Sequence, residues 1–127
     1  MFTTRSLYLA LLAGALAASA SPLVRRDVPS GTVTDKTISY TDFSTGVTAC
    51  GQSYDSSLNE QNSIGVDTGF GVEACGRSVT ITAPNGQVHS GIVVDLGAEN
   101  GNLNISPSMF SQFYNLDQGV FQGDYKL

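Results

Sequence analysis

Few side chains in this sequence of 127 residues could carry chemistry. There is one histidine, His89, and there are two cysteines, Cys50 and Cys75, too few for the three or four convergent ligands of a usual His/Cys zinc site. Asp95 follows the apolar run 92–94. A carboxylate at the end of a buried strand needs hydrogen-bond partners, so Asp95 is expected either to anchor the fold or to contact a ligand.

The N-terminus carries the pattern of a secretory signal peptide. A positive residue precedes an apolar run over 7–18, and a small-x-small cleavage site ends at Ala20. The run is too short for a membrane anchor. The pair Arg25-Arg26 is typical of a dibasic processing site, the alternative being a chance pair in a leader. The predicted organisation is a signal peptide over 1–20, a propeptide over 21–26 and one domain over 27–127.

The two cysteines of the sequence agree with export from the cell. Two cysteines in an exported chain most simply form one disulfide, and closing a loop of this length contributes roughly 3–4 kcal/mol in the chain-entropy model. Two free thiols or an intermolecular bridge remain the alternatives. We therefore predict a secreted, extracellular protein with a bridge between Cys50 and Cys75.

The charge of the predicted domain limits its partners. Residues 27–127 contain three basic and eleven acidic side chains, a formal net charge of −8. Such a surface disfavours nucleic acid and anionic membranes and tolerates neutral partners such as polysaccharides. The sequence shows no cofactor motif, and we expect neither a cofactor nor a metal.

Alternating apolar and polar residues predict short strands separated by turns. The turn Pro84-Asn85-Gly86 joins the clearest hairpin, whose second strand carries 92–94 buried on both faces. The leader 27–36 and the polar segment 52–63 are expected to lack regular structure, as are residues 42–49 and 97–102. The predicted strands cover 37–41, 63–67, 78–83, 88–96 and 119–125.

One helix is predicted, beginning after Ser106. Ser106 is a good N-cap, and Pro107 occupies the first helical position, where its missing N–H costs nothing. Apolar side chains at helical spacing continue to Tyr114, and the helix is expected to stop near Asn115. Several short strands with one short helix near the C-terminus indicate a mainly β fold, a small β-barrel.

Three segments together resemble the RlpA-like double-psi β-barrel superfamily. They are I-S-Y-T-D-F-S-T-G with A-C-G over 38–51, A-C-G-R running into V-T-I over 74–81, and V-V-D followed by N-L-N-I-S-P over 93–107. The superfamily includes the catalytic-like domain of expansins, barwin-type proteins, family-45 endoglucanases and small secreted fungal proteins, the last of which suit the export pattern. The resemblance implies a six-stranded double-psi β-barrel with a groove across one face.

The resemblance also implies a groove site with one carboxylate missing. Asp42 occupies the place of the first groove carboxylate, and Asn104 stands where a second is found; Asp95 lies nearby. Inverting hydrolysis of a glycoside needs both an acid and a base, and an amide has no proton to give near neutral pH. We therefore favour a non-hydrolytic module, with an amide tautomer acting as base as the alternative.

Aromatic and amide side chains complete the predicted binding set. Tyr40, Phe43 and Tyr54 are candidate rings for stacking on sugars, although core filling is the favoured interpretation for Tyr40 and Phe43. Asn104 also begins the sequon 104–106, in which the following proline disfavours glycosylation. The predicted binding residues are Tyr40, Asp42, Tyr54, Asp95 and Asn104.

Three functions follow from the resemblance. The favoured one is a secreted, monomeric, expansin-like module that binds or loosens cell-wall polysaccharide. The alternative is a protein-binding module, specifically an inhibitor of papain-like cysteine proteases or an effector-like protein, with the segment 52–62 as its contact loop. A glycoside hydrolase or an enzyme of the riboflavin aldehyde-forming type is the third.

Overall fold

The computed structural model describes residues 28–44, 48–53 and 56–127. The predicted signal peptide with Ala20, the processing site at Arg25 and Arg26, and the aromatic Tyr54 lie outside the described residues.

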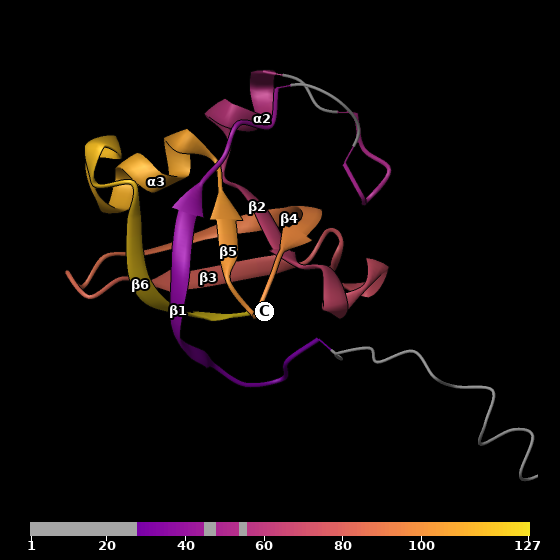
Figure 1. Ribbon diagram of the computed structural model, residues 1–127, viewed down its shortest axis with the longest axis horizontal. Helices are drawn as coiled ribbons and strands as arrows, with labels where there is room; N and C mark the ends of the chain where they lie inside the picture. Colours follow the sequence, from indigo (N-terminus) through magenta and orange to yellow (C-terminus); the bar gives the residue numbers. More distant parts are fainter. Residues whose placement is uncertain (1–27, 45–47, 54–55) are drawn as a thin grey trace, which may run out of the picture.

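Six strands close into a barrel in the order β1-β5-β2-β4-β3-β6. The pairs β1–β5 and β2–β4 are parallel, and the other four neighbouring pairs are antiparallel. Figure 1 shows β1 and β5 side by side at the front, with β3 crossing behind them. The strands are β1 (Val33–Tyr40), β2 (Ser63–Asp67), β3 (Ser78–Thr82), β4 (Val88–Ala98), β5 (Leu103–Ile105) and β6 (Val120–Lys126).

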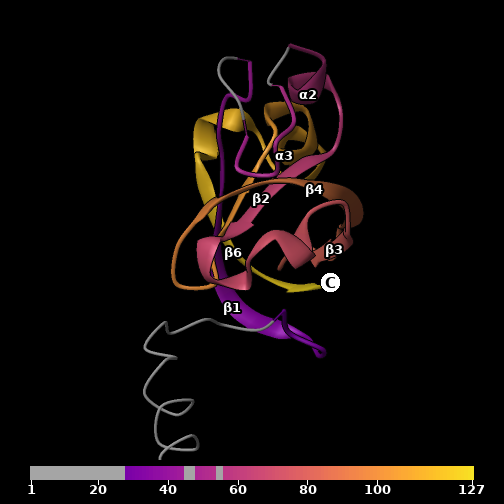
Figure 2. The ribbon, with the colours of Figure 1, turned by 90° about the vertical axis from the view of Figure 1, so that its right-hand side faces the viewer.

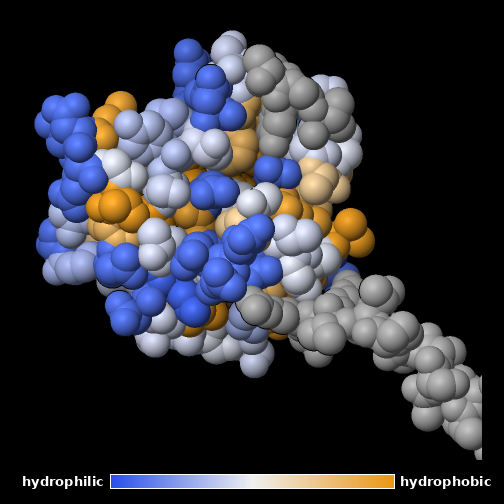
Figure 3. Space-filling model, in the orientation of Figure 1, coloured by the Kyte–Doolittle hydropathy of each residue, from blue (hydrophilic) through white to orange (hydrophobic). Residues whose placement is uncertain are grey.

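The inner side of the barrel is filled by the apolar residues that alternate along the strands. Side chains from β1, β2 and β5 are completely buried there: Ile38, Ile64, Val66, Leu103 and Ile105. Successive residues of a strand point to opposite faces, so the residues between them lie on the outer side of the barrel. That outer side carries the polar residues considered below. Figure 3 shows mostly hydrophilic side chains over the face viewed in Figure 1, with apolar surface in small separate areas.

Two helices gather at one end of the barrel, as Figures 1 and 2 both show. Helix α3 (Pro107–Phe113) starts as predicted: the Ser106 hydroxyl accepts a hydrogen bond from the Met109 N–H, and Pro107 stands at the first helical position. Its apolar side buries Met109, Phe110 and Phe113 against the barrel.

Helix α2 (Ser56–Glu60) corrects the prediction that 52–63 lacks regular structure and that the chain has one helix. It has five residues and only one buried side chain, Leu58. Leu58 forms a small second apolar cluster with Phe43 and Val94. A single apolar residue in a polar segment carries no periodicity, so the pattern gave no sign of this helix.

Strand boundaries differ from the predictions where pairing overrides composition. β1 begins at Val33, inside the segment expected to be an irregular leader, because Val33 pairs with Tyr125 of β6. β4 continues to Ala98, and the unpredicted strand β5 occupies only three residues between β1 and β2. Ile92 is 48% exposed, so the expectation that 92–94 is buried on both faces is wrong for that residue.

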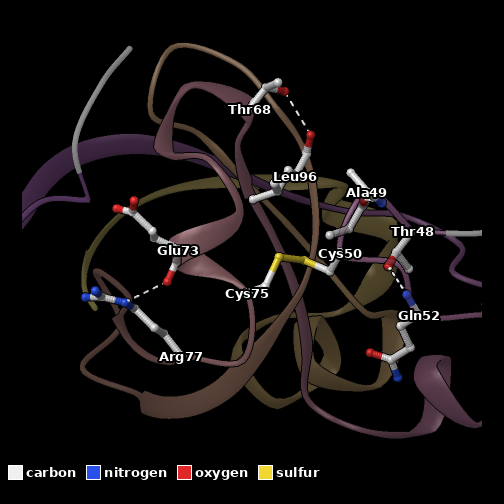
Figure 4. Close-up of a disulfide and its surroundings, with 10 residues drawn as sticks. Thr48, Ala49, Cys50, Gln52, Thr68, Glu73, Cys75, Arg77 and Leu96 are labelled. Atoms are coloured by element: carbon white, nitrogen blue, oxygen red, sulfur yellow. Dashed lines mark hydrogen bonds between the residues drawn. A yellow bond between two sulfur atoms is a disulfide. The ribbon is translucent and has the colours of Figure 1, made fainter.

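The segment between β2 and β3 consists of two short 3-10 helices, η1 (Thr68–Phe70) and η2 (Val72–Ala74). The predicted disulfide between Cys50 and Cys75 is confirmed and ties this segment to the loop before α2 (Figure 4). A third 3-10 helix, η3 (Leu116–Gln118), joins α3 to β6. Within the described part of the chain, no helix has the length and apolar character needed to cross a bilayer.

Candidate functional site

Four residues on the outer side of the barrel form one row across four neighbouring strands. Ser39 of β1 pairs with Asn104 of β5, Asn104 pairs with Gly65 of β2, and Gly65 pairs with Asp95 of β4. The Ser39 hydroxyl donates to the Asn104 side-chain oxygen over 3.2 Å. We call Ser39, Asn104, Gly65 and Asp95 the polar row; it contains the predicted residues Asn104 and Asp95.

Gly65 leaves a gap in the middle of the polar row. A Cβ atom built on Gly65 would lie 3.6 Å from the Asn104 Cβ and 3.7 Å from the Asp95 Cβ. Both neighbouring side chains therefore rise from the same surface on either side of a residue that has none. Gly65 itself is buried, and the half-buried amide of Asn104 and carboxylate of Asp95 lie on either side of it.

Asp95 is half-buried and holds part of the adjacent loop in place. Its Oδ1 accepts a hydrogen bond of 2.9 Å from the Ala49 N–H, next to the disulfide residue Cys50. The Gly97 position lies close to its other oxygen, since a Cβ built there would be 3.0 Å from Oδ2. Asp95 thus holds the backbone of Ala49 and also lies within the polar row.

Asp42 is held at the end of β1 by a different set of contacts. Its Oδ1 accepts hydrogen bonds from the Ser44 N–H at 2.8 Å and from the Asn59 side-chain amide at 2.7 Å. The Asn59 oxygen in turn accepts the Phe43 N–H at 2.8 Å, so α2 is fastened to the chain after β1. Hydrogen bonds from Ser44 and Asn59 lower the pKa of the Asp42 carboxyl below its ordinary value.

The small apolar cluster brings the segment that carries Asp42 against the strand that carries Asp95. Phe43 follows Asp42 directly, and Val94 precedes Asp95. Since Phe43 and Val94 pack together with Leu58, the segment after β1 and the middle of β4 meet under α2. A hollow of about 380 Å³ lies beyond Val94 on the outer side of β4, beside the half-exposed Ile92.

Two other sequence-predicted aromatic residues do not join the polar row. Tyr40 lies on the opposite side of β1 from Ser39, where its ring packs edge-on against Phe110 at a centroid distance of 5.1 Å, although 38% of the residue is exposed. Phe43 is buried in the small cluster, which confirms the core-filling interpretation for that residue.

His89, the histidine set aside above as a metal ligand, lies half-buried on β4. The ring lies edge-on against Phe113 at 4.9 Å, and its Nε2 is buried without a hydrogen-bond partner within the described residues. His89 lies on the same side of β4 as the core residue Val93, opposite the exposed Val88, and Phe113 of α3 packs against it. No group of three or more His, Cys, Asp or Glu side chains comes together in the part of the chain that the structure describes.

The sequon lies in the wall of the barrel. Asn104 is half-buried between β1 and β2, and the Ser106 side chain is completely buried as the N-cap of α3. The Asn104 amide oxygen is occupied by the Ser39 hydroxyl. Glycosylation at Asn104 stays a prediction.

Comparison with solved structures finds proteins of similar architecture. A papain inhibitor from Streptomyces is similar over 79% of this chain and 97% of its own, with a TM-score of 0.65 and 22% identity. An expansin from Clavibacter michiganensis is similar over 75% of this chain with a TM-score of 0.61 and 21% identity; the match spans about half of the expansin, 49%. Cerato-platanin 3 from M. perniciosa is similar over 76% of this chain and 93% of its own, with a TM-score of 0.53 and 18% identity.

The fold is a double-psi β-barrel. The closed order of six strands with two parallel pairs and the likeness to these structures confirm the mainly β class predicted from the sequence. No family model and no curated protein sequence matches the chain.

Two members of the polar row, Ser39 and Gly65, were not predicted from the sequence. Gly65 and Asn104 each lie between two buried apolar residues, in I-G-V and L-N-I, and Ser39 lies between the buried Ile38 and the partly exposed Tyr40. The same three-residue pattern therefore marks one outward position in each of three strands. Only the strand order shows that these positions are neighbours.

Proposed function

We propose that this protein is a secreted, non-hydrolytic module that binds cell-wall polysaccharide through the polar row. The observation that carries the proposal is the row itself, in which Ser39, Asn104 and Asp95 surround the gap at Gly65. The half-buried hydroxyl, amide and carboxylate groups of this row match the hydroxyl groups along a sugar chain, and an acidic surface does not repel neutral sugars. The expansin of the same fold has been solved, as a variant, in complex with cellohexaose.

The absence of hydrolysis is part of the proposal. Within the polar row, Asp95 is the one carboxylate and Asn104 is an amide whose oxygen is engaged by Ser39. A glycosidase with two carboxylates would need an acid at the place of Asn104. Loss of one acid or base group costs roughly 10²–10⁴-fold in rate, so we expect binding without turnover.

Secretion is proposed from the leader pattern and is supported by the disulfide. A bridge between Cys50 and Cys75 persists in an oxidising compartment. An extracellular monomer of the RlpA-like superfamily, of the small fungal kind, released after Arg26 and placed at the cell wall, is the form of the protein that we propose.

The test is retention of the protein on insoluble cellulose, chitin and β-glucan. We expect retention on one polymer, lost in Asp95→Asn and reduced in Asp42→Ala, without release of reducing sugar. Asp117→Asn is the matched control, because Asp117 is an exposed acid in η3, on the chain between α3 and β6. Equal retention of Asp95→Asn and the unchanged protein, or no retention on any polymer, would rule out binding at the polar row.

A second candidate function is inhibition of a papain-type cysteine protease. The barrel corresponds to 97% of the Streptomyces papain inhibitor, so a single barrel is nearly the whole of that protein. In this chain the segment between β2 and β3 adds a rigid exposed surface of the kind that suits a protein partner. Inhibition of papain by the purified protein tests it, and inhibition should be unaffected by Asp95→Asn.

A further inference from the structure

We propose that residues 68–75, which we call the stapled turn, form a preformed protein-binding surface whose apex, Val72, enters the substrate cleft of a papain-type protease. The inference rests on the second function proposed above. The contact surface is then the stapled turn and not the segment 52–62, which was the contact loop expected from the sequence.

Among the residues that the structure describes, Val72 is the most exposed large apolar residue. It is 67% exposed, whereas Val88, the next, is 51% exposed and lies on the outer side of β4. The two residues that flank the apex at a spacing of two, Phe70 and Ala74, are buried in the main core. The turn is therefore pinned on both sides of Val72, and this one aliphatic side chain projects outward.

Hydrogen bonds fix the entry to the stapled turn. The Asp67 carboxylate accepts the Gly69 N–H at 2.7 Å, and the Thr68 hydroxyl donates to the Leu96 carbonyl of β4 at 2.8 Å (Figure 4). The Gly71 N–H donates to the Thr68 carbonyl at 3.2 Å, closing η1. Gly71 itself has a φ of 73°, a conformation that favours glycine, and it sets the direction change before Val72.

Hydrogen bonds and the disulfide fix the C-terminal end of the stapled turn. The Cys75 N–H donates to the Val72 carbonyl at 3.1 Å, and the side chain of Cys75 is bonded to Cys50. The Gly76 N–H then donates to the Val93 carbonyl of β4 at 2.9 Å. In Figure 4, Arg77 reaches back to the Glu73 carbonyl, a hydrogen bond of 3.1 Å, beside the disulfide.

A stiff convex turn with one apolar apex suits an enzyme cleft. Ligand clefts are concave and mostly apolar, and complexes of proteases with their inhibitors form with little movement of the backbone. A surface that is already ordered loses little conformational entropy on binding. Burial of one valine side chain is worth about a tenfold gain in affinity. The exposed Glu73 beside Val72 supplies a polar edge around the apex.

The test measures the inhibition constant for papain of the full exported protein and three variants. We expect Val72→Asp to weaken inhibition at least about tenfold and Val72→Ala to weaken it several-fold. Val88→Asp is the matched control, because it places the same charge on another exposed valine of this chain. The control should inhibit like the unchanged protein, and thermal unfolding should show all variants folded.

The outcomes separate the inference from the function on which it rests. Inhibition by the unchanged protein that persists at full strength in Val72→Asp would overturn the role of the stapled turn and leave the inhibitor function standing. Equal losses in Val72→Asp and Val88→Asp would likewise overturn it, since the effect would then follow charge alone. Failure of the unchanged protein to inhibit papain would overturn both.

Discussion

Asp95 and Asn104 stand on either side of Gly65, with their Cβ atoms 3.7 and 3.6 Å from the point that a Gly65 Cβ would occupy. They come from β4 and β5, which are separated in the barrel by β2. An ordinary side chain at position 65 would fill the space between the amide and the carboxylate. The space between the amide and the carboxylate therefore depends on a residue that has no side chain.

Gly65→Ala should lower polysaccharide retention while leaving the fold intact. The new methyl group would meet its neighbours at ordinary contact distances, and alanine costs less than glycine in a strand, so the free energy of unfolding should stay level or rise by up to about 1 kcal/mol. Denaturant unfolding and polymer retention measure the two effects.

Gly91→Ala provides the contrast for Gly65→Ala. A Cβ at position 91 would lie 2.6 Å from the Asn62 carbonyl oxygen and 2.9 Å from the Ile64 side chain, so something must shift. We expect this variant to lose about 1–3 kcal/mol of stability. Similar stabilities for the two variants would contradict the packing described for β2 and β4.

A comparison of two substitutions at Asp95 should separate anchoring of the loop from the proposed binding of polysaccharide. Asp95→Asn keeps an oxygen for the Ala49 N–H and should cost little stability, whereas Asp95→Ala leaves that donor without its partner and should cost about 1 kcal/mol. Both variants should lose polysaccharide retention. Retention by Asp95→Asn alone would show that the carboxylate only anchors the loop.

Tyr125 should make the fold sensitive to strong alkali. Its hydroxyl donates to the Gly101 carbonyl at 2.7 Å, and burial, with the nearby Asp67 carboxylate, raises its pKa to about 12. Because this folded-state pKa lies above the unfolded value near 10, the stabilisation is fully present below pH 10 and is lost as the pH rises through about 12.

Absorbance titration and unfolding measurements check this prediction. One tyrosine should ionise near pH 12 in the folded protein, and that step should vanish in Tyr125→Phe. The same variant should unfold about 1 kcal/mol more easily at neutral pH, since the Gly101 carbonyl loses a donor. Ionisation of all tyrosines near pH 10 would contradict the buried position of Tyr125.

The disulfide should be a major source of stability. Removing the bridge by Cys50→Ala with Cys75→Ala frees a loop of 25 residues in the unfolded chain, a cost of roughly 3–4 kcal/mol. Denaturant midpoints of the double variant and the oxidised protein measure it. The reduced unchanged protein should match the double variant, and a midpoint equal to that of the oxidised protein would contradict the prediction.

The sequence by itself determined the local elements with strong patterns. Strict alternation identified β3 and the hairpin to β4, and Ser106 with Pro107 identified the start of α3, because each depends on neighbouring residues alone. It also determined the disulfide, since two cysteines in an exported chain leave one simple pairing.

Only the tertiary structure decided which residues of the candidate site are neighbours. β5 is three residues long and α2 buries only Leu58, so neither is stabilised by its own sequence; each exists because a neighbouring segment pairs with it or packs on it. Ser39, Gly65, Asn104 and Asp95 lie far apart along the chain and become one row through strand order and register. Register between distant strands is set by closure of the whole barrel, and no local pattern carries that information.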